Sequence, residues 1–270
     1  MVSQASSELG IFILTVPGTR DVTSLIDTVQ KFLNIVPIVV EAMTPAALPC
    51  GGKHLGGSGR HGNGLSCVEV ATSLSHQRAR NLAYARKCDW SLFLEDDSIV
   101  QSSILLLPDL ILEIENLGSR EQTVGIHLFP EQFGILRKHT RSLLNVIALP
   151  DYAVGYVLNA KALRESEKLA EKIHLNVADW PKGMDQIHWY APTRSLITHP
   201  NLDNHPSQSQ IEEQRRLRAS QSSFSYRFVN YPLLRILVLR IGSLLGMKYG
   251  KNWIASERIR SVVLLNRGYN

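Results

Sequence analysis

The stretch from Trp90 to Val100, WSLFLEDDSIV, constrains the fold more than any other part of the chain. A short apolar run leads directly into three consecutive acids, Glu95, Asp96 and Asp97. Such a run is typical of a central strand in a sheet that is covered on both faces. Three neighbouring carboxylates repel one another unless a positive group lies among them. The sequence therefore predicts a buried strand that ends where a positive charge is needed.

Two interpretations of these acids stay open. A divalent cation such as Mg²⁺ or Mn²⁺ prefers carboxylate oxygens and keeps positions open for phosphate, and α/β sheets bind their ligands at the carboxyl ends of strands. The acids could instead form a solvated turn, with Asp97 capping a following helix. A phosphatase of the haloacid dehalogenase type is disfavoured, because its nucleophilic aspartate would have to stand where this chain has Glu95.

Strand patterns and helix patterns alternate along most of the chain, which predicts an α/β fold with a mixed central sheet. The opening is a β-α-β unit, with strands in 11–16 and 36–43 and a helix that begins near Asp21. Further strands are expected in 91–94, 123–129, 143–149, 152–159 and 195–199. Helices are expected over 68–87, 104–117 and 160–174, followed by a turn that opens a short helix through Tyr190.

Length and composition fit one α/β domain with an appendage. A chain of 270 residues with 44% hydrophobic and 20% charged residues can bury a substantial core. No secretory signal is predicted, because the first apolar run, 11–16, is too short. The three cysteines, Cys50, Cys67 and Cys88, have no metal-binding spacing and cannot all pair, which favours a reducing compartment over a disulfide framework.

The charge is divided unevenly along the chain. From residue 214 onward there are eleven Lys or Arg and one acid, whereas the rest has 18 basic and 23 acidic residues. We therefore expect a domain over 1–212 and a basic amphipathic helical tail over 213–270. Its apolar part, 231–247, is too short to span a bilayer and suits a helix on an anionic membrane surface. Docking on the sheet or on a second copy is the alternative, and nucleic-acid binding is disfavoured because the cations interleave with aliphatic residues.

Two motifs together resemble glycosyltransferase family 25. The first is EVATSLSH at 69–76, on a predicted helix, and the second is LFLEDD at 92–97. They are similar to the family's Gly-Glu-x-Gly-Cys-x-x-Ser-His helix and to its apolar strand followed by Glu-Asp-Asp. The segments 151–158 and 179–185 are similar to two later motifs, so that the resemblance covers roughly residues 11–212.

The resemblance implies a GT-A-like (Rossmann-like) fold and an enzyme that moves a sugar from a nucleotide sugar to a glycan, as in lipopolysaccharide-type assembly. It implies a divalent metal, Mn²⁺ or Mg²⁺, which Asp97 would bind beside the leaving diphosphate. His199, at a strand end, is the expected second ligand, with His205 as the alternate. An inverting transfer needs a base for the acceptor hydroxyl. Asp185 is the expected base, with Asp179 second.

The resemblance also implies a set of donor-binding residues: Glu69, Ser75, His76, Glu95 and Asp96. Arg20 follows the first predicted strand, and either meets a nucleotide phosphate or is a solvated turn residue. A different role stays open for three more of the predicted site residues. His76 could be a hydrogen-bonded core residue, His199 a solvated loop histidine, and Asp185 an acid that favours a helix dipole.

Together these inferences predict a cytoplasmic enzyme, peripheral on the inner face of the cell membrane. Its partners would be a nucleotide sugar, a glycan or lipid-linked acceptor and an anionic surface, but no nucleic acid. Val68 and Ala71 stand where the family pattern has glycines, and Thr72 where it has cysteine. These departures motivate a second hypothesis, a catalytically inactive relative that serves as a membrane-tethered binding or scaffold protein.

Overall fold

The computed structural model describes residues 8–48, 67–118, 122–129, 135–148, 153–169, 184–200 and 247–249. The strands of its main sheet are β1 (Leu9–Thr15), β2 (Ile38–Glu41), β3 (Trp90–Glu95), β5 (Val124–His127), β6 (Ile135–Lys138), β7 (Leu143–Ala148), β8 (Gly155–Asn159), β9 (His188–Pro192) and β11 (Met247–Tyr249). They form one mixed sheet in the order β11-β6-β7-β9-β5-β8-β3-β1-β2. A separate two-stranded sheet joins β4 (Ile99–Val100) to β10 (Ile197–Thr198). The predicted mixed α/β sheet is therefore confirmed.

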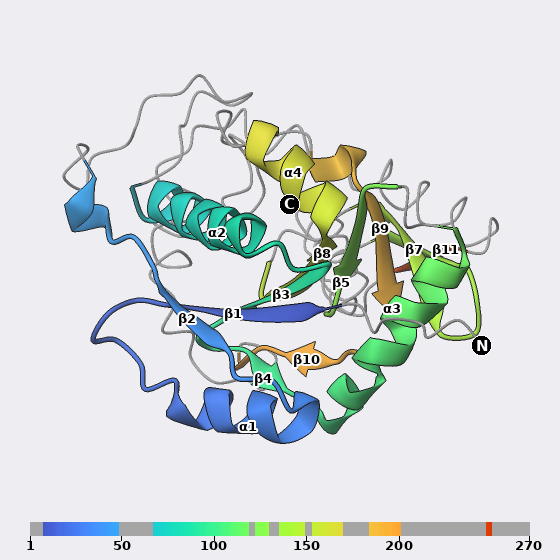
Figure 1. Ribbon diagram of the computed structural model, residues 1–270, viewed down its shortest axis with the longest axis horizontal. Helices are drawn as coiled ribbons and strands as arrows, with labels where there is room; N and C mark the ends of the chain where they lie inside the picture. The colour runs from blue at the N-terminus through green and yellow to red at the C-terminus, as the bar shows by residue number, and fades with distance from the viewer. Residues whose placement is uncertain are drawn as a thin grey trace, which may run out of the picture.

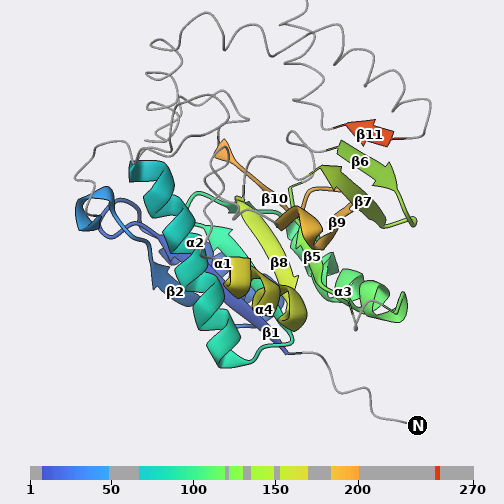
Figure 2. The same cartoon turned by 90° about the horizontal axis from the view of Figure 1, so that it is seen from above.

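Helices cover both faces of the main sheet (Figure 1). The helices are α1 (Thr23–Leu33), α2 (Cys67–Arg86), α3 (Leu107–Asn116) and α4 (Ala160–Leu169), with short 3₁₀ turns η1 (Pro45–Ala47), η2 (Ser102–Leu106) and η4 (Met184–Gln186). One face carries α2 and α4 side by side, and the opposite face carries α1 and α3 (Figures 1 and 2). Pro108 lies in the first turn of α3, where its missing N–H costs nothing.

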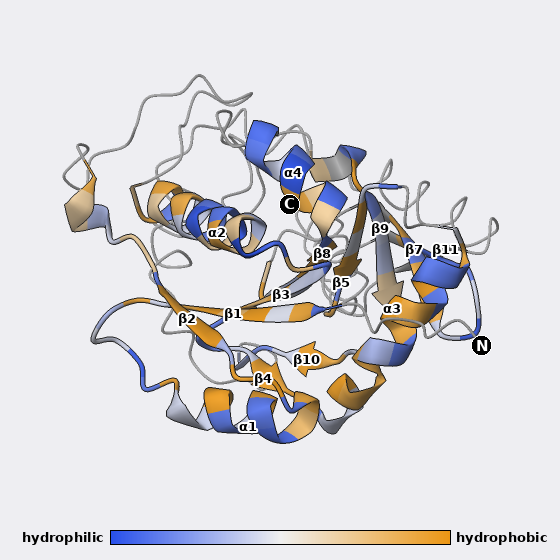
Figure 3. Ribbon diagram, in the orientation of Figure 1, coloured by the Kyte–Doolittle hydropathy of each residue, from blue (hydrophilic) through white to orange (hydrophobic). Residues whose placement is uncertain are grey.

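Alternation along β1 builds the two cores. Ile11 and Ile13 pack into the core on the α1 and α3 side, whereas Phe12 and Leu14 pack into the core below α2 and α4. All four are nearly inaccessible to solvent, and each such side chain contributes about 1.5–3 kcal/mol through burial. Figure 3 shows the result, an apolar β1 below helices that have one apolar and one polar side. Strand β1 thus fits a position that is covered on both faces, between β3 and the edge strand β2.

Aromatic rings form a row across three neighbouring strands on the α2 side. Phe12 of β1 stacks on Phe93 of β3 with ring centroids 5.5 Å apart, and Phe93 stacks on Tyr156 of β8 at 4.9 Å. Trp189 of β9 meets Tyr156 edge-on at 6.3 Å. The strand register places each of these partners directly opposite the next, Phe12 to Phe93 and Phe93 to Tyr156.

The reversal of direction between β3 and β8 shapes the end of the predicted acidic strand. Strand β3 runs parallel to β1 but antiparallel to β8, so the end of β3 lies beside the start of β8. There the carbonyl oxygen of Val154 accepts hydrogen bonds from the Glu95 N–H at 3.1 Å and from Ser98 Oγ at 2.7 Å. These bonds hold the turn after β3, and β4 follows it. The interpretation of Asp97 as a helix cap is therefore wrong.

Two parts of the sheet differ from the prediction. The short helix expected through Tyr190 is wrong: only Met184–Gln186 forms a 3₁₀ turn, and His188–Pro192 is strand β9. Strand β9 pairs with β5 on one side and β7 on the other, and these long-range hydrogen bonds decide its conformation. Strand β6 was not predicted, and the strand expected over 195–199 is the short β10 outside the main sheet.

The C-terminal tail is described only at Met247–Tyr249. These residues form β11 and pair antiparallel with Ile135, Leu136 and Arg137 of β6, so the helical prediction is wrong for them. The remainder of the tail lies outside the described residues, and its helix and its membrane contact stay predictions. Within the described ranges, no helix has both the length and the apolar character needed to cross a membrane.

The cysteines also depart from expectation. Cys67, the first residue of α2, is disulfide-bonded, and its partner lies outside the described residues. Cys88 is a buried free thiol. One disulfide is not a framework, but the bond at Cys67 counts against the interpretation that the chain keeps its cysteines reduced.

Candidate functional site

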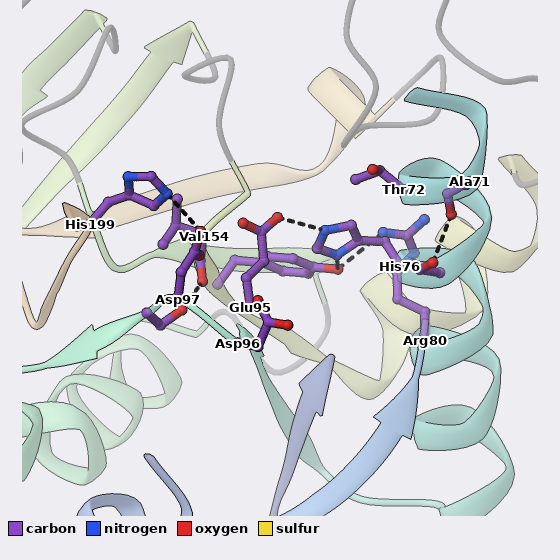
Figure 4. A network of polar contacts seen from close by, with 12 residues as sticks. Ala71, Thr72, His76, Arg80, Glu95, Asp96, Asp97, Val154 and His199 are labelled. Carbon is purple, nitrogen blue, oxygen red and sulfur yellow. Dashed lines mark hydrogen bonds and ion pairs between the residues drawn. The ribbon is translucent and has the colours of Figure 1, made fainter. Parts of the chain in front are cut away.

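A cavity of about 260 Å³ opens at the carboxyl ends of β1 and β3. Residues from β1, the end of β2, α2 and β3 line it: Leu14, Val16, Thr19, Arg20, Ala42, Met43, Val68, Thr72, Ser75, His76, Glu95, Asp96 and Asp97. The lining combines apolar side chains with the three acids. Figure 4 shows Glu95 directed toward His76 and Asp97 toward His199. The cavity therefore offers an apolar surface next to a dense group of charges.

Arg20 supplies positive charge among the acids. Its Nη1 lies 2.8 Å from Asp97 Oδ2 and 3.3 Å from Asp96 Oδ1. Asp96 Oδ2 also accepts hydrogen bonds from Thr15 Oγ1 at 3.2 Å and from the Val16 N–H at 3.3 Å. Burial raises the pKa of Asp96 in spite of these contacts. Asp96 thus ties the end of β1 to the turn after β3, and the exposed Arg20 is held by ion pairs with two of the acids.

His199 and Asp97 meet although 102 residues separate them. His199 Nε2 lies 3.1 Å from Asp97 Oδ2, and His199 is buried, so it is not a solvated loop histidine. Burial raises the pKa of Asp97, but the hydrogen bonds from His199 and Arg20 outweigh burial and lower it. Burial lowers the pKa of His199, but Asp97 outweighs it and raises that pKa. The three residues stabilise one another's charged forms.

The donor set at this point fits a divalent cation through two protein ligands. Asp97 Oδ1 is buried and has no hydrogen-bond partner among the described residues, which leaves an oxygen lone pair for a cation. His199 Nε2 lies beside the same carboxylate, and it could bind a cation once it has lost the hydrogen that it holds toward Asp97 Oδ2. Within the described part of the chain, no group of three or more His, Cys, Asp or Glu side chains gathers for a metal. Mg²⁺ sites with one or two protein carboxylates take their other ligands from phosphate and water.

Glu95 lies on the opposite side of the acid group, against α2. Its Oε1 lies 3.1 Å from His76 Nε2, and His76 Nδ1 lies 3.2 Å from the hydroxyl of Tyr156. Arg80 Nη1 donates to the same hydroxyl at 3.0 Å. Burial, followed by the charge of Asp97, raises the pKa of Glu95 to about 8. The structure therefore brings the predicted His76 and Glu95 together, and makes His76 a buried residue that also lines the cavity.

Sequence reasoning did not identify Arg80 and Tyr156 as site residues. A signal for Arg80 existed, because it follows His76 by four residues and so lies on the same face of α2. Tyr156 belongs to the strand motif at 151–158. What the sequence does not reveal is that both side chains converge on one histidine.

Ser75 lines the cavity but has a structural role. Its Oγ donates to the Ala71 carbonyl at 2.7 Å and accepts from the Met43 N–H at 2.8 Å, so it joins α2 to the chain after β2. Glu69 is buried and does not line the cavity. It precedes the cavity residue His76 by seven residues, which is about two turns, so the two lie on the same face of α2. The role of Glu69 in donor binding stays a prediction.

The predicted bases are only partly described. Asp185 is the middle residue of η4, between the buried Met184 and Gln186, but its side chain lies outside what the structure describes. Asp179 and the alternate ligand His205 lie outside the described residues altogether. Their roles stay predictions.

No family model matches the chain, and no curated protein matches it. Among solved structures, it is similar to A197 from STIV, with a TM-score of 0.37 and 13% identity over 70% of this chain and 83% of that one. It is also similar to a mannose-1-phosphate geranyltransferase from Thermus thermophilus (TM-score 0.34, 12% identity, 68% and 73% of the two chains). A third is CMP:2-keto-3-deoxy-manno-octonic acid synthetase complexed with CTP (0.34, 12%, 80% and 100%). Likenesses this remote carry no functional argument, so the chemistry rests on the site's own geometry.

Proposed function

We propose that the protein is a glycosyltransferase that takes a sugar from a nucleotide sugar and passes it to a glycan acceptor of the lipopolysaccharide or surface-polysaccharide type. The observation that carries the proposal is the cavity at the end of β3, which is lined by apolar side chains together with Glu95, Asp97 and Arg20. A nucleotide sugar has matching parts: a flat base for the apolar side chains, ribose hydroxyls for a carboxylate, and a diphosphate for a cation.

Arg20 is the residue we assign to the diphosphate. A guanidinium donates in a planar fork that matches phosphate oxygens, and the Arg20 side chain keeps a third of its surface exposed at the cavity. Its contacts with Asp96 and Asp97 hold it at the site before a ligand enters. In the proposed complex it would exchange part of its contact with Asp97 for phosphate oxygens.

Asp97 and His199 are the residues that we propose hold Mn²⁺ or Mg²⁺. Such an ion supplies positive charge that stabilises a leaving nucleoside diphosphate. Asp97 contributes the buried Oδ1 that has no other partner among the described residues, and His199 contributes the nitrogen that lies 3.1 Å from Oδ2 of the same carboxylate. The transfer is proposed to be inverting, with Asp185 as the base that removes the acceptor proton and Asp179 as its alternate.

A second candidate, a non-catalytic binding protein with the same cavity, is favoured by one specific observation. Arg20 already neutralises Asp96 and Asp97 through contacts of 3.3 and 2.8 Å, so the acids do not depend on a metal for charge balance. In this candidate the cavity still binds a nucleotide or sugar phosphate, but Mn²⁺ has no effect on that binding and nothing is transferred.

Thermal unfolding against a panel of nucleoside diphosphates and nucleotide sugars, each with Mn²⁺ or with EDTA, tests the proposal. A ligand that binds only the folded protein raises the melting temperature by mass action. We expect at least one nucleotide to raise it more with Mn²⁺ than with EDTA. In Asp97→Asn that metal-dependent difference should disappear, whereas Asp27→Asn, an exposed acid on α1, should keep it.

The outcomes separate the candidates. A nucleotide that raises the melting temperature equally with Mn²⁺ and with EDTA favours the binding protein. Release of free sugar from a nucleotide sugar, or transfer of the sugar to an added glycan, favours the enzyme. A panel without any shift contradicts both candidates at this cavity.

We also propose that the basic tail binds an anionic membrane surface, where lipid-linked acceptors are held. The support is its charge, because Arg215, Arg216 and Arg218 begin a segment with eleven basic residues and one acid. Sedimentation with vesicles of anionic lipid should fall when these three arginines become glutamates. Vesicles of neutral lipid are the control, and equal sedimentation of both proteins with anionic vesicles would contradict the assignment. This design leaves β11 in place, which a truncation would remove.

A further inference from the structure

Four side chains form a continuous line of polar contacts from the protein interior to the cavity (Figure 4). Arg80 Nη1 lies 3.0 Å from Tyr156 Oη, Tyr156 Oη lies 3.2 Å from His76 Nδ1, and His76 Nε2 lies 3.1 Å from Glu95 Oε1. Arg80, Tyr156 and His76 are at most 2% exposed, whereas Glu95 keeps a quarter of its side chain accessible. The line therefore begins in the core and ends at the ligand cavity.

The chemistry of the first residue gives the line a direction. A guanidinium has donors and no acceptor, so Tyr156 Oη accepts from Arg80. A hydroxyl that accepts from a cation becomes a stronger donor, and His76 Nδ1 is beside it. A neutral imidazole whose Nδ1 accepts carries its hydrogen on Nε2. When Glu95 is ionised, His76 donates that hydrogen to Glu95 Oε1, so every bond of the line is donated toward the cavity.

The burial of Arg80 indicates that its hydrogen bond to Tyr156, and not packing alone, accounts for an arginine at this position. Arginine is almost never fully buried unless it is paired with an acid. Arg80 Nε has no hydrogen-bond partner among the described residues, and its Nη1 bonds to a neutral hydroxyl. Such a burial costs stability, because part of the cation's hydration is lost without an ion pair in return. A methionine of similar length would pack at this position at lower cost if packing were the only requirement.

The surrounding structure fixes the geometry of the line. The ring of Tyr156 is stacked on Phe93 at 4.9 Å and meets the edge of Trp189 at 6.3 Å, so its hydroxyl has little freedom. His76 and Arg80 are one turn apart on α2, which brings both side chains to that one hydroxyl.

We propose that Arg80 and Tyr156 are positioning residues that hold His76 as the Nε2–H tautomer, and that His76 thereby fixes the Glu95 carboxylate as the acceptor for a sugar hydroxyl of the bound ligand. The ribose of a nucleotide, with two adjacent hydroxyls, is the group that such a carboxylate recognises. The identity of this ligand rests on the proposed function, but the state of His76 does not.

The first test reads His76 directly. Protein with ¹⁵N-labelled histidine is examined by NMR at a pH above the value of about 8 to which burial raises the pKa of Glu95, so that Glu95 is a carboxylate. The His76 signals are assigned by their loss in His76→Gln. In the wild type we expect Nδ1 without hydrogen and Nε2 with it. Tyr156→Phe and Arg80→Met should give His76 a measurable share of Nδ1–H, whereas Arg80→Lys, which still donates, should preserve the wild-type state. Arg78→Met, an exposed arginine on the same helix, is the matched control.

The second test, at the same pH, reads ligand preference by calorimetry with UDP, CDP, GDP and ADP and their 2′-deoxy forms. The wild type and Arg80→Lys should prefer the ribose form of the bound nucleotide by about tenfold, the size of one hydrogen bond to a charged group. In Tyr156→Phe the preference should fall to about twofold or less, while the affinity for inorganic pyrophosphate stays unchanged.

Three results would overturn the inference: a wild-type His76 that carries hydrogen on Nδ1, a Tyr156→Phe protein with unchanged His76 signals, or an unchanged ribose preference in that variant. If none of the nucleotides binds, the proposed function fails. The NMR comparison then still decides whether Arg80 and Tyr156 set the state of His76.

Discussion

Replacing Glu95 with glutamine tests what the partly buried carboxylate at the end of β3 costs the folded protein. Burial, followed by the charge of Asp97, raises the pKa of Glu95 from its ordinary value of 4.5 to about 8. Between these two values the folded protein holds a proton on Glu95 that the unfolded chain has released. The free energy of unfolding therefore falls as the pH rises through this window.

The size of the effect follows from the width of the window. One proton held by the folded protein alone changes the free energy of unfolding by about 1.4 kcal/mol per pH unit. Between about pH 5.5 and 7.5 this gives an upper value of roughly 3 kcal/mol. A quarter of the Glu95 side chain is exposed, and solvent screening reduces the effect to about 1–2 kcal/mol. Glutamine is neutral throughout, so Glu95→Gln should not lose this part of the stability.

Urea unfolding at both pH values in EDTA measures the difference. We expect the wild type to lose about 1–2 kcal/mol more than Glu95→Gln on going from the lower to the higher pH. Asp97 and His199 titrate in both proteins, so most of their contribution cancels in the comparison. Glu165→Gln, on the exposed surface of α4, should behave as the wild type. Equal losses in the wild type and Glu95→Gln would refute the reasoning.

Three further variants probe the site and its support. Arg20→Gln should weaken nucleoside diphosphate binding about tenfold, because a charge-assisted hydrogen bond is lost. The same variant should strengthen Mn²⁺ binding to the ligand-free protein. Calorimetry that finds neither change would contradict the role of Arg20. Gly155→Ala should lower the free energy of unfolding by about 1–3 kcal/mol, because the added methyl group would overlap the buried Ile197 side chain; an unchanged urea midpoint would refute this. Ser98→Ala removes the 2.7 Å bond to the Val154 carbonyl and should cost about 1 kcal/mol in the same assay, less than Gly155→Ala.

The parts of the fold that sequence reasoning predicted are those with strong local patterns. Strand β3 is a continuous apolar run, and α1 repeats apolar residues at helical spacing, so local physics decides both. Strands β6 and β9 have weaker patterns. Strand β6, ILRK, ends in two cations, and β9, HWYAP, begins with histidine and ends in proline. Their conformation depends on pairing with β7 and β5, which no short window contains.

The candidate site divides in the same way. The acids and His199 could be predicted, because polar residues at strand ends collect at one edge of a sheet. The ion pairs of Arg20 depend on the path that the chain takes after β1, and no pattern in the sequence predicts that path. Helical periodicity places Arg80 on the same face of α2 as His76, but arginine is rarely buried, so composition opposes an interior position.

The row of aromatic rings across β1, β3 and β8 has an optical consequence. Rings held in a fixed, asymmetric environment give a near-ultraviolet circular dichroism signal, which disappears when side-chain packing loosens even if secondary structure persists. Tyr156 stands at the end of this row, beside Trp189 and in contact with His76. Tyr156, one of the chromophores in this row, is thus also a member of the polar line that reaches the cavity. Rearrangement of that line when a ligand enters should be visible in solution without any added label.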